Sequence, residues 1–196
     1  SNYRYNDAIS ELKSAVEISP NWVEARDALI KLYREQNKFN DLFRFLEDSI
    51  KQYPYITKYH LRLAETLSAV GDSYVRQQQV ERGQQFYDRA KIIIEKALEI
   101  SLQDGQPSDY DQVYHRFLGI LLKTEQFEKV LSLTEKGLAE KPNGFYLYIR
   151  RAEALRSLKR QEEALGVFEK ALEVTAETPL LNDRVLSSFS YIADLD

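Results

Sequence analysis

Residues that commonly carry out chemistry are few and scattered in this sequence. Histidine occurs only at His60 and His115, each within a helical pattern, and cysteine is absent, so a thiolate nucleophile and a cysteine zinc site are excluded. Neighbouring carboxylates such as Glu162 and Glu163 have the chemistry for general acid–base catalysis, but on a polar helical stretch they are more often solvated. The sequence contains no His-Glu-x-x-His motif, glycine-rich phosphate loop or nucleophile elbow. We therefore predict no catalytic residue, no cofactor and no metal site, and hence no enzyme.

The composition is typical of a chain that folds around an apolar core. Of the 196 residues, 43% are hydrophobic and 30% are charged. The net charge of −4 argues against a nucleic-acid partner, because such a partner requires a concentrated basic face. No apolar run approaches the roughly 20 residues that span a bilayer, and the first residues do not resemble a signal peptide, so we expect no membrane insertion.

One pattern of mostly apolar residues occurs four times along the chain. The second occurrence follows the first by 34 residues, and the fourth follows the third by 34 residues. Its members alternate small and large side chains, and three of the four sets end in a proline: Tyr5, Ala8, Leu12, Ala15 and Pro20; Phe39, Leu42, Leu46, Ser49 and Pro54; Phe127, Val130, Thr134, Gly137 and Pro142; Gln161, Ala164, Phe168, Ala171 and Ala176. Steps of three and four residues place each set on one face of a helix. The small members allow a second helix to approach closely.

A second kind of helix precedes three of these segments. Its faces carry Ala25, Leu29 and Tyr33; Val113, Phe117 and Leu121; and Tyr148, Ala152 and Leu155. Short polar stretches at 35–38, 123–126 and 157–160 join the two helices of each pair. Because connections this short join antiparallel neighbours, the sequence predicts an all-α protein made of a row of helix pairs.

This pattern resembles the tetratricopeptide repeat (TPR), a 34-residue helix pair. The best match runs from Tyr148 to Ala171 and includes the stretches 151–155 and 163–165 with Phe168. Ser49, Thr134 and Gly137 depart from the usual residues and are expected to weaken individual units. The resemblance implies a right-handed α-solenoid of antiparallel helix pairs. Its units would be a half repeat at 3–22, repeats at 23–56, 57–110, 111–144 and 145–181, and a truncated first helix or cap at 182–196.

The unit at 57–110 is longer than one repeat. One interpretation is a hairpin of two lengthened helices, about 56–77 and 80–101, which turns at Gln77–Gln79 and keeps both apolar faces in register. The other interpretation places the turn at Gly71–Asp72, the better turn dipeptide, before one long second helix. Both interpretations predict a loop at residues 103–109, with Ser108 or Asp109 as the N-cap of the next helix.

The two ends of the sequence suggest an excerpt from a longer array. Residues 3–19 have the pattern of a second helix without its partner, with Ile9, Leu12 and Val16 on an uncovered face. Residues 182–196 have the pattern of a first helix that bears Phe189 and Ile192. Uncovered apolar faces tend to find partners, so we predict weak homo-oligomers. Trp22 is expected to pack between units.

The resemblance also implies that the first helices line a concave groove in which a protein or peptide partner lies. The N-terminal part of this groove would carry a mixed to acidic set, namely Glu24, Asp27, Lys31, Arg34, Glu65, Ser68 and Asp72. The C-terminal part would carry Gln112 together with the candidate partner-binding residues, namely His115, Arg116, Lys123, Tyr146, Arg150, Glu153, Arg156 and Tyr191. Because arginine binds carboxylates through a planar fork, we expect an acidic ligand there.

Two classes of function are compatible with the sequence. The favoured one is a protein–protein interaction scaffold that binds its partner in the groove. The alternative is a structural module that self-assembles through its end faces or its long central hairpin. The clamp that some relatives use for chaperone tails is not reproduced, because the corresponding positions hold Asp27, Lys31 and Ala69.

Overall fold

The computed structural model describes residues 2–20, 22–104 and 107–176. These residues form α-helices joined by short connections: α1 (Asn2–Ile18), α2 (Val23–Glu35), α3 (Phe39–Gln52), α4 (Thr57–Arg76), α5 (Val80–Asp104), α6 (Pro107–Lys123), α7 (Phe127–Glu140), α8 (Phe145–Ser157) and α9 (Gln161–Thr175). None of the helices in this part of the chain is long and apolar enough to cross a bilayer.

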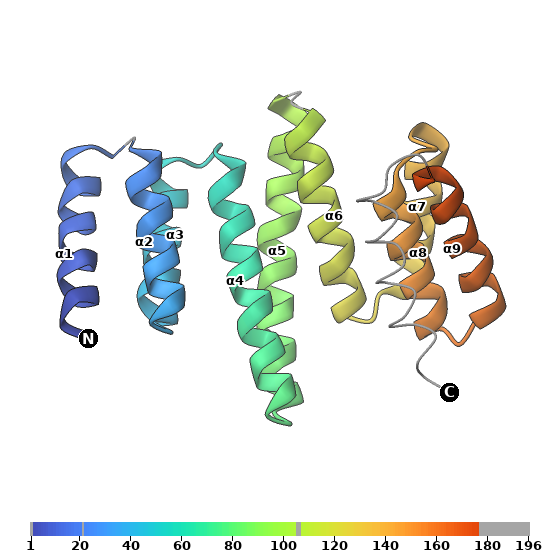
Figure 1. Cartoon of the computed structure of the whole chain (residues 1–196), viewed down its shortest axis with the longest axis horizontal. Coiled ribbons are helices and arrows are strands. Elements are labelled where there is room, and N and C mark those ends of the chain that lie inside the picture. The colour runs from blue at the N-terminus through green and yellow to red at the C-terminus, as the bar shows by residue number, and fades with distance from the viewer. Residues whose placement is uncertain (1, 21, 105–106, 177–196) are drawn as a thin grey trace.

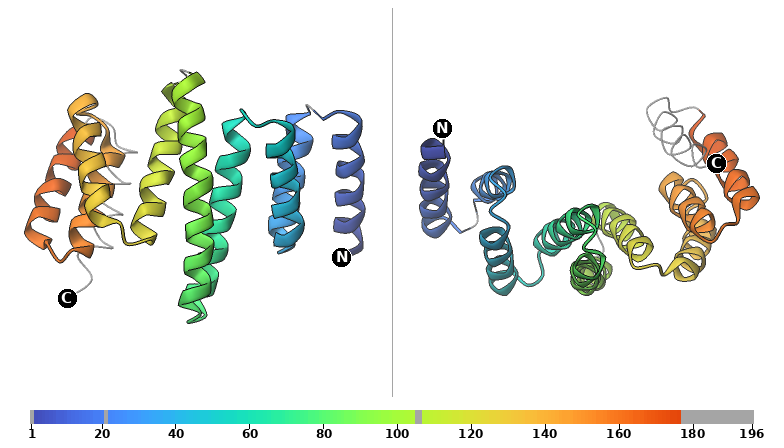
Figure 2. Two further views of the ribbon diagram at one scale, coloured as in Figure 1. Left: turned by 180° about the vertical axis from the view of Figure 1, so that it is seen from behind. Right: turned by 90° about the horizontal axis from the view of Figure 1, so that it is seen from below.

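The helices stand side by side in a row that follows the order of the sequence (Figure 1). Each packs against the next, and α6 also contacts both α4 and α8. The row curves, with α2, α4, α6 and α8 on its inner side and α3, α5 and α7 on its outer side (Figure 2). The prediction of an all-α solenoid of antiparallel helix pairs is therefore confirmed.

The apolar stripes read from the sequence form the core. Leu42 and Leu46 on α3, and Ala164, Phe168 and Ala171 on α9, are fully or almost fully buried. Their spacing of three and four residues places them on the single helix face that the neighbouring helices cover.

The same turn joins the two helices of each of four pairs. Each turn contains one residue with a positive φ angle: Asn37 (54°), Gln78 (61°), Glu125 (56°) and Lys159 (60°). The following residue donates its backbone N–H to a carbonyl five residues earlier, in Lys38 to Tyr33, Gln79 to Tyr74, Gln126 to Leu121 and Arg160 to Leu155. This bonding satisfies carbonyl groups that the helix end would leave without a partner.

The turn of the long central hairpin lies at Gln77–Gln79, between α4 and α5. The interpretation with two lengthened helices is therefore the correct one, and the tip extends past the neighbouring helices (Figure 1). Gly71 and Gly83 face each other where the two helices approach: a β-carbon at Gly83 would lie 3.0 Å from the carbonyl oxygen of Gly71.

The loop predicted at 103–109 is wrong in extent. Helix α5 continues to Asp104, and α6 already begins at Pro107, so neither Ser108 nor Asp109 is an N-cap. Proline suits the first position of a helix because its missing N–H has no partner there in any case.

Helix α1 does not present the expected uncovered apolar face. Ile9 and Val16 are buried and Leu12 is half-buried, because α1 packs these residues toward α2. Phe189 and Ile192 lie outside the described residues. The apolar face that was expected to support weak self-association through α1 is therefore not exposed. Self-association in general stays a prediction.

A buried arginine explains why serine replaces the usual small apolar residue at position 49. Arg26 on α2 is almost inaccessible to solvent, and its Nη1 donates to Ser49 Oγ at 2.8 Å. Its Nε donates to the Pro20 carbonyl oxygen at 2.6 Å, and its Nη2 donates to Gln52 Oε1 at 3.3 Å. Ser49 therefore completes a hydrogen-bond network that alanine would leave unsatisfied.

Candidate functional site

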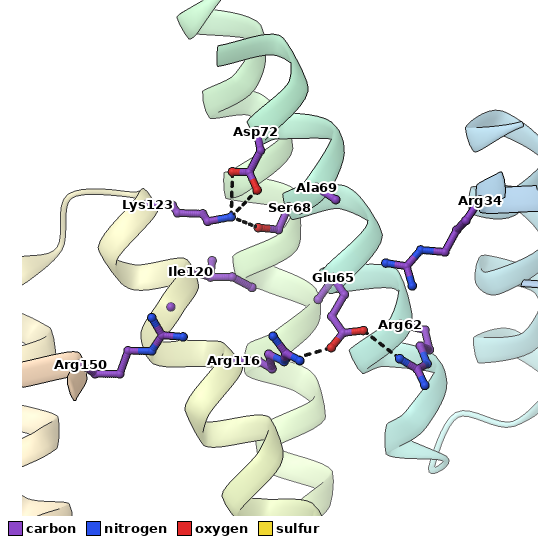
Figure 3. A pocket seen from close by; sticks show the side chains of 12 residues that line it. Arg34, Arg62, Glu65, Ser68, Ala69, Asp72, Arg116, Ile120, Lys123 and Arg150 are labelled. Atoms are coloured by element: carbon purple, nitrogen blue, oxygen red, sulfur yellow. Dashed lines mark hydrogen bonds and ion pairs between the residues drawn. The ribbon is translucent and has the colours of Figure 1, made fainter. Parts of the chain in front are cut away.

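A cavity of about 430 Å³ opens on the inner side of the curve, between α4 and α6 (Figure 3). Helices α2 and α8 add one arginine each from opposite sides. The lining consists of Arg34, Arg62, Ala64, Glu65, Ser68, Ala69, Asp72, Arg116, Gly119, Ile120, Lys123 and Arg150. The cavity is therefore polar and strongly charged.

Helical spacing brings the charged side chains to this face. On α4, Glu65, Ser68 and Asp72 follow one another at steps of three and four residues, and on α6 Arg116 and Lys123 lie two turns apart. The two helices pack against each other with these faces turned inward.

Ion pairs connect α4 to α6 across the cavity. Lys123 Nζ lies 2.7 Å from both carboxylate oxygens of Asp72 and 2.9 Å from Ser68 Oγ. Arg116 Nε lies 3.0 Å from Glu65 Oε1, and Arg62 Nη1 lies 3.1 Å from Glu65 Oε2. Glu65, whose side chain is 14% exposed, is thus shared by two arginines.

Positive charge exceeds negative charge in this lining. Asp72 neutralises Lys123, but Glu65 has to serve both Arg62 and Arg116. Among the described residues, the Arg34 side chain has neither a hydrogen bond nor an ion pair, although it extends toward the cavity (Figure 3). The cavity therefore has guanidinium groups with unused donors.

Arg150 reaches the cavity from α8 over Gly119. A β-carbon at Gly119 would lie 3.2 Å from Arg150 Nη2, so the glycine leaves space for the guanidinium group. Arg150 Nη1 donates to Glu153 at 2.7 Å, and Nη2 lies 3.3 Å from His115 Nε2. Tyr146 packs edge-on against His115, with ring centroids 5.4 Å apart.

His115 is neutral at pH 7. Burial, followed by the charges of Arg150 and Arg116, lowers its pKa to about 4. The contact with Arg150 assigns an acceptor role to Nε2, so the proton belongs on Nδ1. Among the described residues, His115 Nδ1 and Arg150 Nε are both buried and have no hydrogen-bond partner.

This environment predicts a pH dependence of stability. The unfolded histidine titrates near pH 6.5 and the folded one near pH 4, so the unfolded state binds more protons between these values. The free energy of unfolding should therefore fall as the pH is lowered through this window. At pH 5, His115 should account for about 2 kcal/mol of this loss.

The measurement is urea unfolding of the wild type and of His115→Gln at pH 7 and at pH 5. The variant should lose about 2 kcal/mol less than the wild type on acidification. His60, whose pKa is also lowered by burial, contributes equally to both proteins. An identical loss in the two proteins would contradict the assignment to His115.

The predicted groove residues fall into three positions. Arg116, Lys123 and Arg150 line the cavity. Three do not line it. Glu153 and His115 contact the guanidinium group of Arg150, and Tyr146 packs against His115, with its hydroxyl 3.5 Å from Asp111 Oδ1. Arg156 is half-buried on α8 outside the lining, and Tyr191 lies outside the described residues.

One charged lining residue, Arg62, was not predicted, and neither were the uncharged lining residues Ala64, Gly119 and Ile120. Arg62 lies one turn before Glu65 on α4, and this spacing of three residues is the signal that places both on the same face. The sequence analysis assigned Arg34, Glu65, Ser68 and Asp72 to a separate, mixed to acidic part of the groove. In the structure they line the same cavity as Arg116 and Arg150. Within the described ranges, no group of three or more His, Asp or Glu side chains is placed to hold a metal ion.

The fold and the sequence both point to tetratricopeptide repeats. The family model described as the tetratricopeptide repeat matches residues 145–178. A similar solved structure is TTC0263, a thermophilic TPR protein of Thermus thermophilus, which has 20% sequence identity and a TM-score of 0.64; the match covers 95% of this chain and 91% of that one.

Two structures of MamA are also similar. The one described as MamA MSR-1 C2 has 22% identity and a TM-score of 0.59, with 90% of each chain covered. The other, a crystal structure of the MamA protein, has 20% identity and a TM-score of 0.53, with 91% of this chain and 86% of that chain covered. No curated protein matches this chain in sequence. The resemblance to the tetratricopeptide repeat is therefore confirmed, and the architecture is that of a TPR solenoid.

Proposed function

We propose that this protein is a non-catalytic, protein-binding scaffold whose groove takes a carboxylate-rich segment of a partner. The observation that carries the proposal is the arginine surplus in the cavity between α4 and α6, where the Arg34 side chain has no partner among the described residues and Glu65 is shared by two arginines. A TPR solenoid suits this role, because stacked helix pairs create an extended concave surface.

Glu65 supports the choice of a carboxylate as the recognised group. Its two oxygens are each approached by a different guanidinium group, Arg62 on one side and Arg116 on the other. A carboxylate from a partner would make the same charge-assisted hydrogen bonds with Arg34 and Arg150, whose guanidinium groups border the same cavity. Arginine is suited to this contact because its donors form a planar fork.

The proposal predicts that removing two exposed groove arginines weakens binding of an acidic peptide. The probe is a fluorescently labelled peptide of about ten residues that alternates aspartate and serine. Arg34→Ala with Arg116→Ala should lower its affinity about tenfold at low salt, and the salt dependence of binding should decrease. The matched control is Arg76→Ala with Arg82→Ala, which removes the same charge from the tip of the α4–α5 hairpin. An equal loss in both double variants would mean that the peptide responds only to net charge.

A change at Glu65 should act in the opposite direction. Glu65→Gln frees Arg62 and Arg116 from their internal carboxylate, so the same peptide should bind several-fold more tightly. Fluorescence anisotropy measures both effects. Weaker binding to this variant would show that Glu65 does not compete with the ligand and would overturn the proposed site.

A further inference from the structure

Exposed apolar side chains gather on one edge of the N-terminal half, away from the groove. Ile18, Trp22 and Val23 lie where α1 leads into α2, and Tyr55 and Ile56 lie where α3 leads into α4. Both corners lie on the upper edge in Figure 1. Ile18 is 83% exposed, Tyr55 72% and Trp22 51%, so the expectation that Trp22 packs between units is wrong. These five residues are called the corner platform below.

Arg26 ties the two corners together. It donates hydrogen bonds to the Pro20 carbonyl oxygen in the first corner and to Gln52 at the end of α3, next to the second corner. Its guanidinium group also lies 5.1 Å from the centroid of the Tyr53 ring and 5.4 Å from that of Tyr59. The platform is therefore preorganised, which reduces the entropy lost when a partner binds.

The solvent-exposed side chains beside the platform that carry an unpaired charge are acidic. Glu17 precedes Ile18 and Glu24 follows Val23, and neither side chain has a hydrogen bond or ion pair among the described residues. The nearby lysines are neutralised, since Lys58 Nζ lies 2.7 Å from Asp27 and Lys51 Nζ lies 3.1 Å from Asp48. Anionic membranes attract basic clusters, so an acidic rim disfavours them as the target.

We propose that the corner platform is a second binding surface, for an amphipathic helix of a partner protein that carries Lys or Arg beside its apolar face. Exposed tryptophan and tyrosine side chains supply the anchors that dominate protein interfaces. The apolar face of the helix covers Trp22 and Tyr55, while its basic residues pair with Glu17 and Glu24. This surface is independent of the groove, because none of its residues lines the cavity.

Trp22 reports directly on this binding, because it is the only tryptophan in the sequence. The probe is a peptide of about 16 residues in which leucines recur at helical spacing and lysines fill the other positions. Its addition should shift the Trp22 emission to shorter wavelength in a saturable manner, and salt should weaken the effect. A peptide with glutamate in place of lysine, and one with leucine and lysine in strict alternation, should produce no shift.

Two variants that keep Trp22 test the surface. Ile18→Ser with Tyr55→Ser should weaken binding more than tenfold, because both side chains lie on the platform and are exposed in the free protein. The matched control, Val80→Ser with Ile92→Ser, removes two comparably exposed apolar side chains from the outer helix α5 and should leave affinity unchanged. Glu17→Gln with Glu24→Gln should weaken binding about threefold and reduce its salt dependence.

Several results would overturn the proposal. One is the absence of a shift in Trp22 emission, and another is an equal loss of affinity in the Val80→Ser, Ile92→Ser control variant. The third is the same emission shift with neutral phosphatidylcholine vesicles, which would indicate a lipid surface instead. The Arg34→Ala, Arg116→Ala groove variant should bind the leucine–lysine peptide normally, so failure of the groove proposal and failure of this one are distinguishable.

Discussion

Replacing Arg26 by methionine should lower the free energy of unfolding by about 3–5 kcal/mol. The change removes three charge-assisted hydrogen bonds, to Pro20, Ser49 and Gln52, from a site that solvent hardly reaches. It also removes the guanidinium group from among the rings of Phe45, Tyr53 and Tyr59. Methionine has a comparable length, so it fills the space but leaves the Pro20 carbonyl without its donor.

Urea unfolding measures this loss, with Arg44→Met as the matched control. Arg44 is exposed on α3, and its replacement should change stability by less than about 0.5 kcal/mol. Arg26→Lys should recover only part of the loss, because an ammonium group cannot reach three acceptors in the planar arrangement of a guanidinium group. Full stability of the methionine variant would mean that the network contributes nothing. In that case the preorganisation of the corner platform would also be in question.

Gly71→Ala and Gly166→Ala should shift stability in opposite directions, with a difference of about 3 kcal/mol between them. Alanine is favoured over glycine inside a helix by roughly 1 kcal/mol, so propensity alone predicts that both changes stabilise. At Gly166 in α9 a new β-carbon would meet no atom of the described residues within 4 Å, so the gain in stability should appear. At Gly71 in α4 the β-carbon would lie 2.6 Å and 2.8 Å from two ring carbons of Tyr87.

Tyr87 cannot move aside at low cost. Its hydroxyl donates a hydrogen bond of 2.7 Å to Asp72, and the ring is buried between α4 and α5. Burial and Asp72 together raise the pKa of the Tyr87 hydroxyl, so it remains a protonated donor. Thermal unfolding should show a rise of about 2–4 °C for Gly166→Ala and a fall of several degrees for Gly71→Ala. A higher melting temperature for both variants would show that the close approach of α4 and α5 has no energetic importance.

The sequence alone was sufficient for the order of the described helices and for their buried faces, but not for the end of α5 and the start of α6. A helix face is defined by residues three and four apart, so the stripes of Leu42, Leu46 and Phe168 could be read without knowing what they pack against. The turn of the long hairpin was harder to read, because glycine is a strong turn signal and Gly71 stands next to an aspartate. The structure uses Gly71 for close packing of two helices and places Gln78 in the left-handed conformation, where glycine would have been expected.

The candidate site depended on information that no single helix carries. Arg34, Glu65, Arg116 and Arg150 come from four different helices, and the rotation between successive helix pairs determines which of them share a cavity. The sequence placed these residues on first helices, but it divided them between a mixed to acidic N-terminal part and a separate C-terminal part of the groove. Tertiary packing brings them to one place, because α6 contacts both α4 and α8.

The same distinction applies to Arg26 and Trp22. By residue type, an arginine belongs on the surface and a tryptophan mostly inside, and the sequence offers no local reason to reverse this. The structure buries Arg26, since Pro20, Ser49 and Gln52 from neighbouring segments supply its acceptors, and it leaves Trp22 half exposed at a corner. Periodicity within a helix therefore determined the secondary structure and the core, whereas partners distant in the sequence decided which polar groups are buried and which apolar ones face solvent.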